Sequence, residues 1–193
     1  DTEIDATEIT VHTTDHPGLF SQIAGAMALC GANVVDAKIL TLADGMALDT
    51  FFVQDTNGEA FNDTAKLEKL RETLEQVISG RLRPSHEIER RQTKDNSHRT
   101  AVFKVEPNVI IDNKASRTHT VIEITARDRL GLLYDITRAL RDLSLQIASA
   151  RISTFGERAV DVFYVKDVFG LKIDSRTKFV QVKETLTQSI QNN

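Results

Sequence analysis

The sequence predicts an α+β protein built from two copies of one small domain, each with the order strand, helix, strand, strand, helix. The first observation is an internal repeat, because Asp-His-Pro-Gly-Leu at 15–19 returns as Asp-Arg-Leu-Gly-Leu at 128–132. The second is a match between Asp-Thr-Phe-Phe-Val-Gln-Asp at 49–55 and Asp-Val-Phe-Tyr-Val-Lys-Asp at 161–167. The 193 residues therefore hold two domains, each of about 100 residues or fewer.

The first strand and helix of each copy follow from the spacing of apolar residues. Apolar and polar residues alternate over 7–13 and at the matching positions of the second copy, as in half-buried strands. Asp15 and Asp128 are expected to cap the helices that follow. Pro17 suits the first turn of the first helix, and Gly31 suits its end. The apolar helix faces are Leu19, Phe20, Ile23, Met27 and Cys30, then Leu132, Leu133, Ile136, Leu140 and Leu143.

Two further strands and a final helix complete each copy. Strands are predicted over 33–42 and 46–54, joined by a turn at Asp44-Gly45, and over 159–166 in the second copy. This order is that of two ferredoxin-like βαββαβ domains in tandem, and it calls for a fourth strand in each. The apolar residues of the final helices are Leu67, Leu70, Leu74, Val77 and Ile78, then Phe179, Val182, Leu186 and Ile190.

The fourth strand of the first copy is expected within 101–112, where 101–105 and 108–111 are short candidates separated by Pro107. The second copy reaches residue 193 directly after its last helix, so it is expected to lack its own last strand. An uncovered first strand in that copy would be prone to pair with other chains. We therefore expect part of 101–112, or another chain, to pair with it.

The predicted domains are residues 1–112 and 113–193, and the first includes a polar, basic linker at 80–100. The basic residues of this linker are expected to be solvated, and contact with an acidic partner or nucleic acid is the alternative. The formal net charge of −4 and the pI of about 5.8 argue against nucleic-acid binding by the chain.

Composition indicates a cytoplasmic globular protein. No stretch approaches the roughly 20 apolar residues of a membrane span. The N-terminal Asp-Thr-Glu-Ile resembles neither an export signal nor a start at methionine, which favours a piece of a longer chain or a processed terminus. Cys30 is the single cysteine, which excludes an internal disulfide and fits a reducing cytoplasm.

The strand-to-helix loops at 15–19 and 128–132 are the candidate ligand sites. A helix N-terminus presents unpaired amide groups and a positive dipole, which attract a carboxylate. Gly18 and Gly131 would let a ligand approach the backbone closely, and the loop aspartates could meet a ligand ammonium group. An amino acid carries both charges on one carbon and would satisfy both. The alternative is structural, with aspartate as a helix cap and glycine as a turn residue.

Other residue patterns point to few further functions. Asn33 and its counterpart Gln146 could bond polar groups of a ligand, although a local turn bond is the alternative for Asn33. The histidines form no pair at metal-ligand spacing, and no catalytic triad, carboxylate cleft or phosphate loop is present. The neighbouring rings at 51–52 and 163–164 point to opposite sheet faces, which argues against an RNA-binding sheet.

The tandem copies resemble ACT domains, which are small amino-acid-sensing modules of metabolic regulation. The segments 113–140 and 150–165, above all Gly-Glu-Arg-Ala-Val-Asp-Val-Phe-Tyr-Val at 156–165, resemble the C-terminal end of the bifunctional uridylyltransferase/uridylyl-removing enzymes. These enzymes modify the PII nitrogen-signal protein of bacteria, and the resemblance covers nearly the whole chain. The family usually has proline where this sequence has Leu130, which predicts a less rigid second loop.

The resemblance implies a regulatory chain without catalytic residues or cofactor, since the nucleotidyltransferase, with its Mg, and the phosphohydrolase domain would precede it. It implies glutamine as allosteric ligand, with PII and the catalytic domains as partners and no nucleic acid or membrane. A homodimer through the ACT sheets is possible. The ligand residues carried over are Asp15, His16, Pro17, Gly18 and Leu19 with Asn33 and Val34, and Asp128, Arg129, Leu130 and Gly131 with Gln146 and Ile147.

By the same resemblance, amides near Gly18 and Leu19 would hold the glutamine carboxylate, Asp15 its ammonium group and Asn33 its side-chain amide. The alternative is a structural module that dimerises or docks catalytic domains, with loops that only begin helices. A small enzyme of the acylphosphatase type is disfavoured, because the sequence lacks a suitable pair of arginine and asparagine in a phosphate loop.

Overall fold

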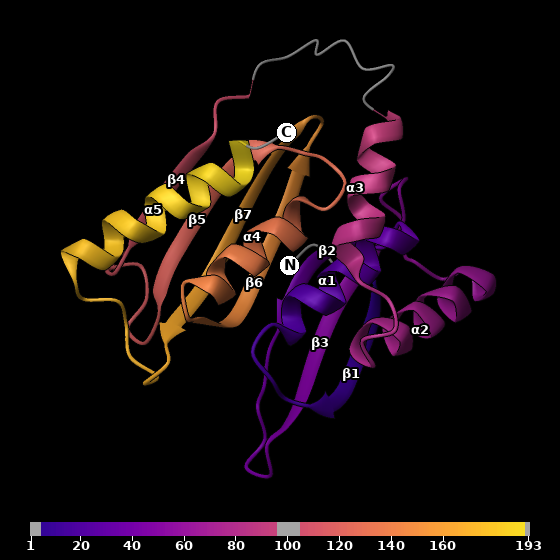
Figure 1. Cartoon of the computed structure of the whole chain (residues 1–193), viewed down its shortest axis with the longest axis horizontal. Coiled ribbons are helices and arrows are strands. Elements are labelled where there is room, and N and C mark those ends of the chain that lie inside the picture. The colour runs from indigo at the N-terminus through magenta and orange to yellow at the C-terminus, as the bar shows by residue number, and fades with distance from the viewer. Residues whose placement is uncertain (1–4, 96–104, 192–193) are drawn as a thin grey trace.

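The computed structural model describes residues 5–95 and 105–191, which share one seven-stranded sheet (Figure 1). Neighbouring strands follow the order β1-β3-β2-β6-β7-β5-β4. The helices lie against one face of this sheet in Figure 1. The two repeats therefore form the two halves of a single layered structure, as the α+β prediction requires.

The first repeat has the predicted element order. Gly31 ends its first helix in the left-handed conformation, with φ 70°, which confirms the predicted end of that helix. Its second strand stops before residue 42, because Thr41 forms only an isolated bridge to Ala47. The elements are β1 (Thr7–Thr14), α1 (Leu19–Cys30), β2 (Asn33–Lys38), β3 (Met46–Gln54) and α2 (Thr64–Ile78).

The second repeat copies this arrangement. Its three strands are neighbours in the order β5-β7-β6, which matches β1-β3-β2 in the first repeat. This equivalence confirms that the sequence repeat is a repeat of structure. The elements are β5 (Thr120–Arg127), α4 (Leu132–Asp142), β6 (Leu145–Phe155), β7 (Arg158–Asp167) and α5 (Arg176–Gln191).

The two halves join side by side through β2 and β6. These equivalent strands pair antiparallel, with Asp36 opposite Arg151 and Lys38 opposite Ser149. Antiparallel pairing reverses one repeat relative to the other, so the start of α1 lies beside the end of α4. At this junction a Cβ atom built on Gly18 would lie 2.7 Å from Cδ of Arg141. The loop before α1 and the end of α4, which are far apart in the sequence, thus lie side by side.

The strand β4 (Asn108–Asp112) pairs antiparallel with β5. This confirms that part of 101–112 covers the first strand of the second repeat. The expectation that this stretch also completes the first repeat is wrong, because among the described residues β1 pairs with β3 alone. The strand β4 therefore lies beside the second repeat in the sheet. The other candidate strand, 101–105, lies outside the described residues except for Val105, which is not in a strand.

Part of the predicted linker at 80–100 is a docked helix. The helix α3 (Pro84–Asp95) contacts α1, and Ile88 on it is only 3% exposed. The guanidinium of Arg91 donates a hydrogen bond of 2.7 Å to the carbonyl oxygen of Leu29. Arg81, Arg83, Arg90 and Arg91 are exposed, as expected for a solvated segment, but the docking of this helix was not predicted, because one isoleucine in a polar stretch was too weak a signal.

The core lies between the sheet and its helices. Phe51 and Phe163 are fully buried at equivalent places on β3 and β7. Their neighbours Phe52 and Tyr164 are half-buried on the alternate positions, as the period of a strand requires. Within residues 5–95 and 105–191, no helix combines the length and apolar character needed to cross a membrane.

Candidate functional site

A cavity of about 680 Å³ lies at the junction where α1 begins and α4 ends. The first repeat contributes the loop before α1 and side chains from β3 and its preceding connection. The second repeat contributes the end of α4 and the start of β6. This volume falls within the range of about 300–1,000 Å³ that is usual for small-molecule sites.

The cavity gathers one part of the predicted ligand residues and excludes the rest. The antiparallel β2–β6 pair brings the first loop to the second repeat, so the lining of the cavity does not follow the grouping that the resemblance implied within each repeat. Asn33 donates instead from Nδ2 to the carbonyl oxygen of Asp55 at 3.2 Å, a bond between residues 22 apart in the sequence that differs from the local turn bond expected as its alternative. The cavity is lined by Asp15, His16, Pro17, Gly18, Leu19, Gln146 and Ile147, and not by Asn33, Val34, Asp128, Arg129, Leu130 or Gly131.

The helix start in this cavity is built by glycine rather than by aspartate. Gly18 is the N-cap of α1 with φ 94°, and no side chain caps the helix there. The predicted cap by Asp15 is therefore wrong, and Pro17 precedes the helix. The Leu19 amide, expected to hold a carboxylate, already donates to the carbonyl oxygen of His16 at 3.1 Å. The amides of residues 20 and 21 follow in the first turn, where helical geometry supplies no intrahelical acceptor.

Asp49 is a cavity residue that the sequence reasoning missed. It lies on β3, lines the cavity and is 1% exposed. Its Oδ1 atom is buried and has no hydrogen-bond partner among the described residues. Burial, and secondarily the nearby carboxylate of Asp15, raise its pKa to about 6, against a hydrogen bond from the Leu40 backbone. Two carboxylates therefore share this wall, and one retains an unsatisfied acceptor.

Asp15, the second carboxylate of this wall, is held in place by a residue of the first repeat. The hydroxyl of Thr41 donates to Oδ2 of Asp15 at 2.6 Å, which leaves Oδ1 of that carboxylate for other donors. A primary ammonium group has three donors and a positive charge, and it would satisfy both aspartates. The signal that points to Asp49 was already in the repeat, since aspartate recurs at residue 161 within an otherwise apolar strand.

The same cavity also contains cationic side chains from the second repeat. Arg141 and Lys166 line it, and the Arg141 guanidinium donates to Oδ1 of Asp142 at 2.6 Å. His119 lines it as well, and burial together with the charge of Lys166 lowers its pKa. A ligand with one carboxylate and one ammonium group would find opposite charges in a single cavity.

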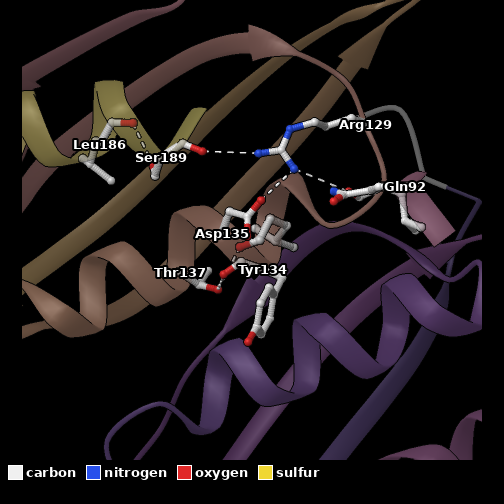
Figure 2. A network of polar contacts seen from close by, with 9 residues as sticks. Gln92, Arg129, Tyr134, Asp135, Thr137, Leu186 and Ser189 are labelled. Carbon is white, nitrogen blue, oxygen red and sulfur yellow. Dashed lines mark hydrogen bonds and ion pairs between the residues drawn. The ribbon is translucent and has the colours of Figure 1, made fainter. Parts of the chain in front are cut away.

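The second loop is closed where the first is open. Arg129 forms an ion pair of 2.6 Å with Asp135 on α4 and donates at 3.3 Å to the carbonyl oxygen of Ser189 on α5. Figure 2 shows its guanidinium between these two helices, with Gln92 of α3 beside it. At the matching position of the first loop, His16 is bonded only locally, 3.3 Å from the carbonyl oxygen of Pro17.

The helix α3 covers the second loop. A Cβ atom built on Gly131, the N-cap of α4 with φ 80°, would lie 2.6 Å from Cγ2 of Ile88. Nε2 of Gln92 donates to the carbonyl oxygen of Leu130 at 2.8 Å. Glycine is needed at 131 both for its left-handed backbone and for this close approach. The predicted cap by Asp128 is wrong for the same reason as that of Asp15.

Ile88→Ala is expected to loosen α3 from the second loop. Loss of a buried isoleucine side chain should lower the free energy of unfolding by about 2–4 kcal/mol in urea titrations. Hydrogen exchange of the α3 amides should accelerate more than that of the sheet. Glu89→Ala, on the exposed side of the same helix, is the control and should change stability by less than about 0.5 kcal/mol. Equal effects of the two substitutions would contradict a docked role for α3.

The second repeat has an equivalent buried aspartate, which does not line the cavity. Asp161 on β7 is 1% exposed, and its Oδ1 has no hydrogen-bond partner among the residues described. Burial, and secondarily Asp128, raise its pKa to about 7, against a backbone hydrogen bond from Ser153. Within the described part of the chain, no group of three or more histidine, cysteine or acidic residues is placed to hold a metal ion.

Comparison with known proteins finds an ACT-like domain in the second repeat. The family described as "ACR9-like, ACT-like domain" matches residues 108–193, which begin at β4 and end with the second repeat. The first repeat has the same strand order and helix positions. Residues 108–193 therefore contain an ACT-like domain, and the first repeat shares its arrangement of strands and helices. The resemblance and the fold class predicted from the sequence are thereby confirmed.

The relatives of this chain are several times its length. The bifunctional uridylyltransferase/uridylyl-removing enzyme of Azospirillum brasilense is 56% identical over 95% of this chain, which covers 20% of that enzyme. The enzyme of the same name from Rhodospirillum rubrum is 53% identical over 98% of this chain, again 20% of its length. The chain therefore corresponds to about a fifth of the length of these relatives.

Solved structures resemble this chain only weakly. An unknown protein from Galdieria sulphuraria covers 97% of the chain with a TM-score of 0.32 and 14% identity. A putative glycine cleavage system transcriptional repressor covers 95% with a TM-score of 0.30 and 14% identity.

Proposed function

We propose that this tandem ACT-like pair senses an α-amino acid, glutamine, in the cavity between its repeats. The observation that carries the proposal is the buried, unpartnered Oδ1 of Asp49 beside Asp15 in a cavity that also holds Arg141 and Lys166. A zwitterion matches this distribution, with its ammonium group against the aspartates and its carboxylate toward the free amides at the start of α1. Gln146 then supplies an amide suited to the glutamine side chain.

The larger proposal is that the pair regulates an enzyme that adds UMP to the PII protein and removes it. The relatives carry the name of that bifunctional enzyme, and this chain matches a fifth of their length. The catalytic domains and PII would then be its partners in a cytoplasmic protein. Glutamine would favour removal over transfer by binding one arrangement of the domains more tightly than another. A coupling of about 1–3 kcal/mol would be typical of such regulation.

The position of the cavity suits this role. Its walls come from both repeats, so a ligand that contacts Asp49 on one side and β6 on the other would change the cost of separating or rotating them. The halves are joined by a short ladder from Asp36 to Lys38 and by packing of α1 against α4, and residues of both helices line the cavity. A ligand in the cavity would therefore report its presence through the relative orientation of the two domains.

Calorimetric titration of glutamine into this chain and into the full-length enzyme tests the proposal. We expect one glutamine per chain, because the first loop opens into the cavity while α3 covers the second. Two equivalent sites would contradict the assignment to a single open cavity. The absence of heat with either protein at roughly 10 mM glutamine, an affinity of only about 3 kcal/mol, would favour a docking or dimerisation module without a small ligand.

A further inference from the structure

The outer edge of β1 borders a groove that a strand would fill. A second cavity, of about 510 Å³, lies between β1 and α2. Among the described residues β1 pairs only with β3, so the backbone groups on its other side have no strand partner. The groove is lined by Thr10, Val11, His12 and Thr13 from β1, by Arg71, Leu74, Glu75 and Ile78 from α2, and by Ser79 and Arg81.

The second repeat shows what belongs in this groove. There β4 occupies the equivalent place, paired with β5 and in contact with α5. Val109 on β4 is 1% exposed, while the next residue, Ile110, is 49% exposed. The occupant of such a groove is therefore an extended segment that runs antiparallel to the first strand and places alternate apolar side chains beneath the last helix.

Apolar side chains around the groove beside β1 are more exposed than their counterparts in the second repeat. Leu186 and Ile190 on α5 are 0% and 8% exposed. Their counterparts Leu74 and Ile78 on α2 are only half-buried. The same difference appears on the strands, since Ile122 on β5 is fully buried and its counterpart on β1 is half-buried. One chain thus presents the groove in a filled and an open form.

We propose that the groove beside β1 is filled by an extended segment of the same polypeptide that directly precedes the first repeat in the longer protein. In the second repeat, β4 directly precedes β5 and is joined to it by residues 113–119 alone. The chain spans about a fifth of the length of its relatives, 20% in each of the two compared above, so such a protein has polypeptide to supply the strand. The inference does not depend on the identity of the ligand.

The chemistry of the segment follows from the groove. The segment needs apolar side chains at two alternate positions to cover Leu74 and Ile78. In the second repeat, Val109 and Ile111 occupy such alternate positions on β4. The positions between them face away from the helix. In the filled repeat the connection to the first strand is short. A connection of that length gives the segment a high effective concentration at the edge of β1, which favours it over a strand from another molecule.

Hydrogen exchange compares this chain with a version extended at its N-terminus by about 20 residues of its natural protein, enough for a strand and its connection. We expect the outward-facing amides of β1 to exchange at least about tenfold more slowly in the extended chain. The amides of β5, which β4 already covers, are the internal control and should exchange equally in both. Equal rates for β1 in the two chains would overturn the proposal.

A matched pair of substitutions on α2 separates a seated strand from general stabilisation. Ile78→Asp in the extended chain should remove the added protection of β1, whereas Gln76→Asp, which places the same charge on the exposed side, should keep it. Protection of β1 in the unextended chain that increases with protein concentration would assign the groove to a second copy and overturn the proposal. Added protection that survives Ile78→Asp would also overturn it.

Discussion

Asp49→Asn should weaken glutamine binding by about 100-fold, whereas Asp161→Asn should leave the affinity within about twofold of the unmodified chain. The two aspartates are equivalent in the repeat and both are 1% exposed. Only Asp49 lines the open cavity. Loss of one buried partner of a charged hydrogen-bonded pair typically costs about 2–5 kcal/mol, and 100-fold corresponds to about 2.7 kcal/mol.

Calorimetry on the two variants measures this difference directly. Circular dichroism and the midpoint of unfolding show whether each variant remains folded, so a loss of binding can be assigned to the cavity. Glutaramate, which lacks the ammonium group of glutamine, should bind the unmodified chain and Asp49→Asn with similar, weak affinity. Unchanged glutamine affinity in Asp49→Asn would refute the role of this carboxylate, while failure of the unmodified chain to bind would refute the proposed function itself.

The sequence was sufficient to predict the order strand, helix, strand, strand, helix in each repeat. The apolar faces that run from Leu19 to Met27 and from Leu132 to Leu140 are strongly periodic, and the repeat supplied an independent check on each element. Gly31 was correctly placed at the end of α1, because a left-handed residue there has few alternatives. The pairing of β4 with β5 followed from the cost of leaving a strand edge uncovered.

The arrangement of the two repeats relative to each other could not be predicted from local sequence patterns. Nothing in the spacing of residues around Ala37 or Ala150 fixes that β2 and β6 pair antiparallel, yet this pair decides which loop faces which strand. Gln146 therefore entered the cavity of the first loop and Asn33 did not. The docking of α3 was not predicted for a related reason, since Ile88 is buried against a loop of the other repeat.

In the sequence, Asp49 served only to align the two repeats, and no role was assigned to its side chain. The alternation of β3 places residues 47, 49, 51 and 53 on the same, buried side. An aspartate on that side violates the binary pattern of the strand, and its recurrence at residue 161 shows that the violation is repeated. A repeated charge on a core face is a physical signal of function, because burial of a carboxylate without a partner lowers stability.

That cost predicts a pH dependence of stability. A carboxyl group whose pKa rises on folding binds more protons in the folded than in the unfolded chain between the two pKa values. Its contribution to stability is present below the ordinary value of 3.8 and is lost as the pH rises through the folded value, about 7 for Asp161. The ionised group then opposes folding, by up to about 4 kcal/mol at 1.36 kcal/mol per pKa unit.

Asp161→Asn removes this ionisation while it keeps an acceptor for the backbone hydrogen bond of Ser153. In urea titrations the variant and the unmodified chain should have similar free energies of unfolding at pH 4, and the variant should be more stable by about 2–4 kcal/mol at pH 8. Asp49→Asn should show the same direction with a smaller difference, because the pKa of Asp49 is raised only to about 6. A constant difference across this pH range would mean that Asp161 ionises as it does in the unfolded chain. With the binding results, this separates the two repeats: both aspartates would lower stability, but only the one in the open cavity would contribute to binding.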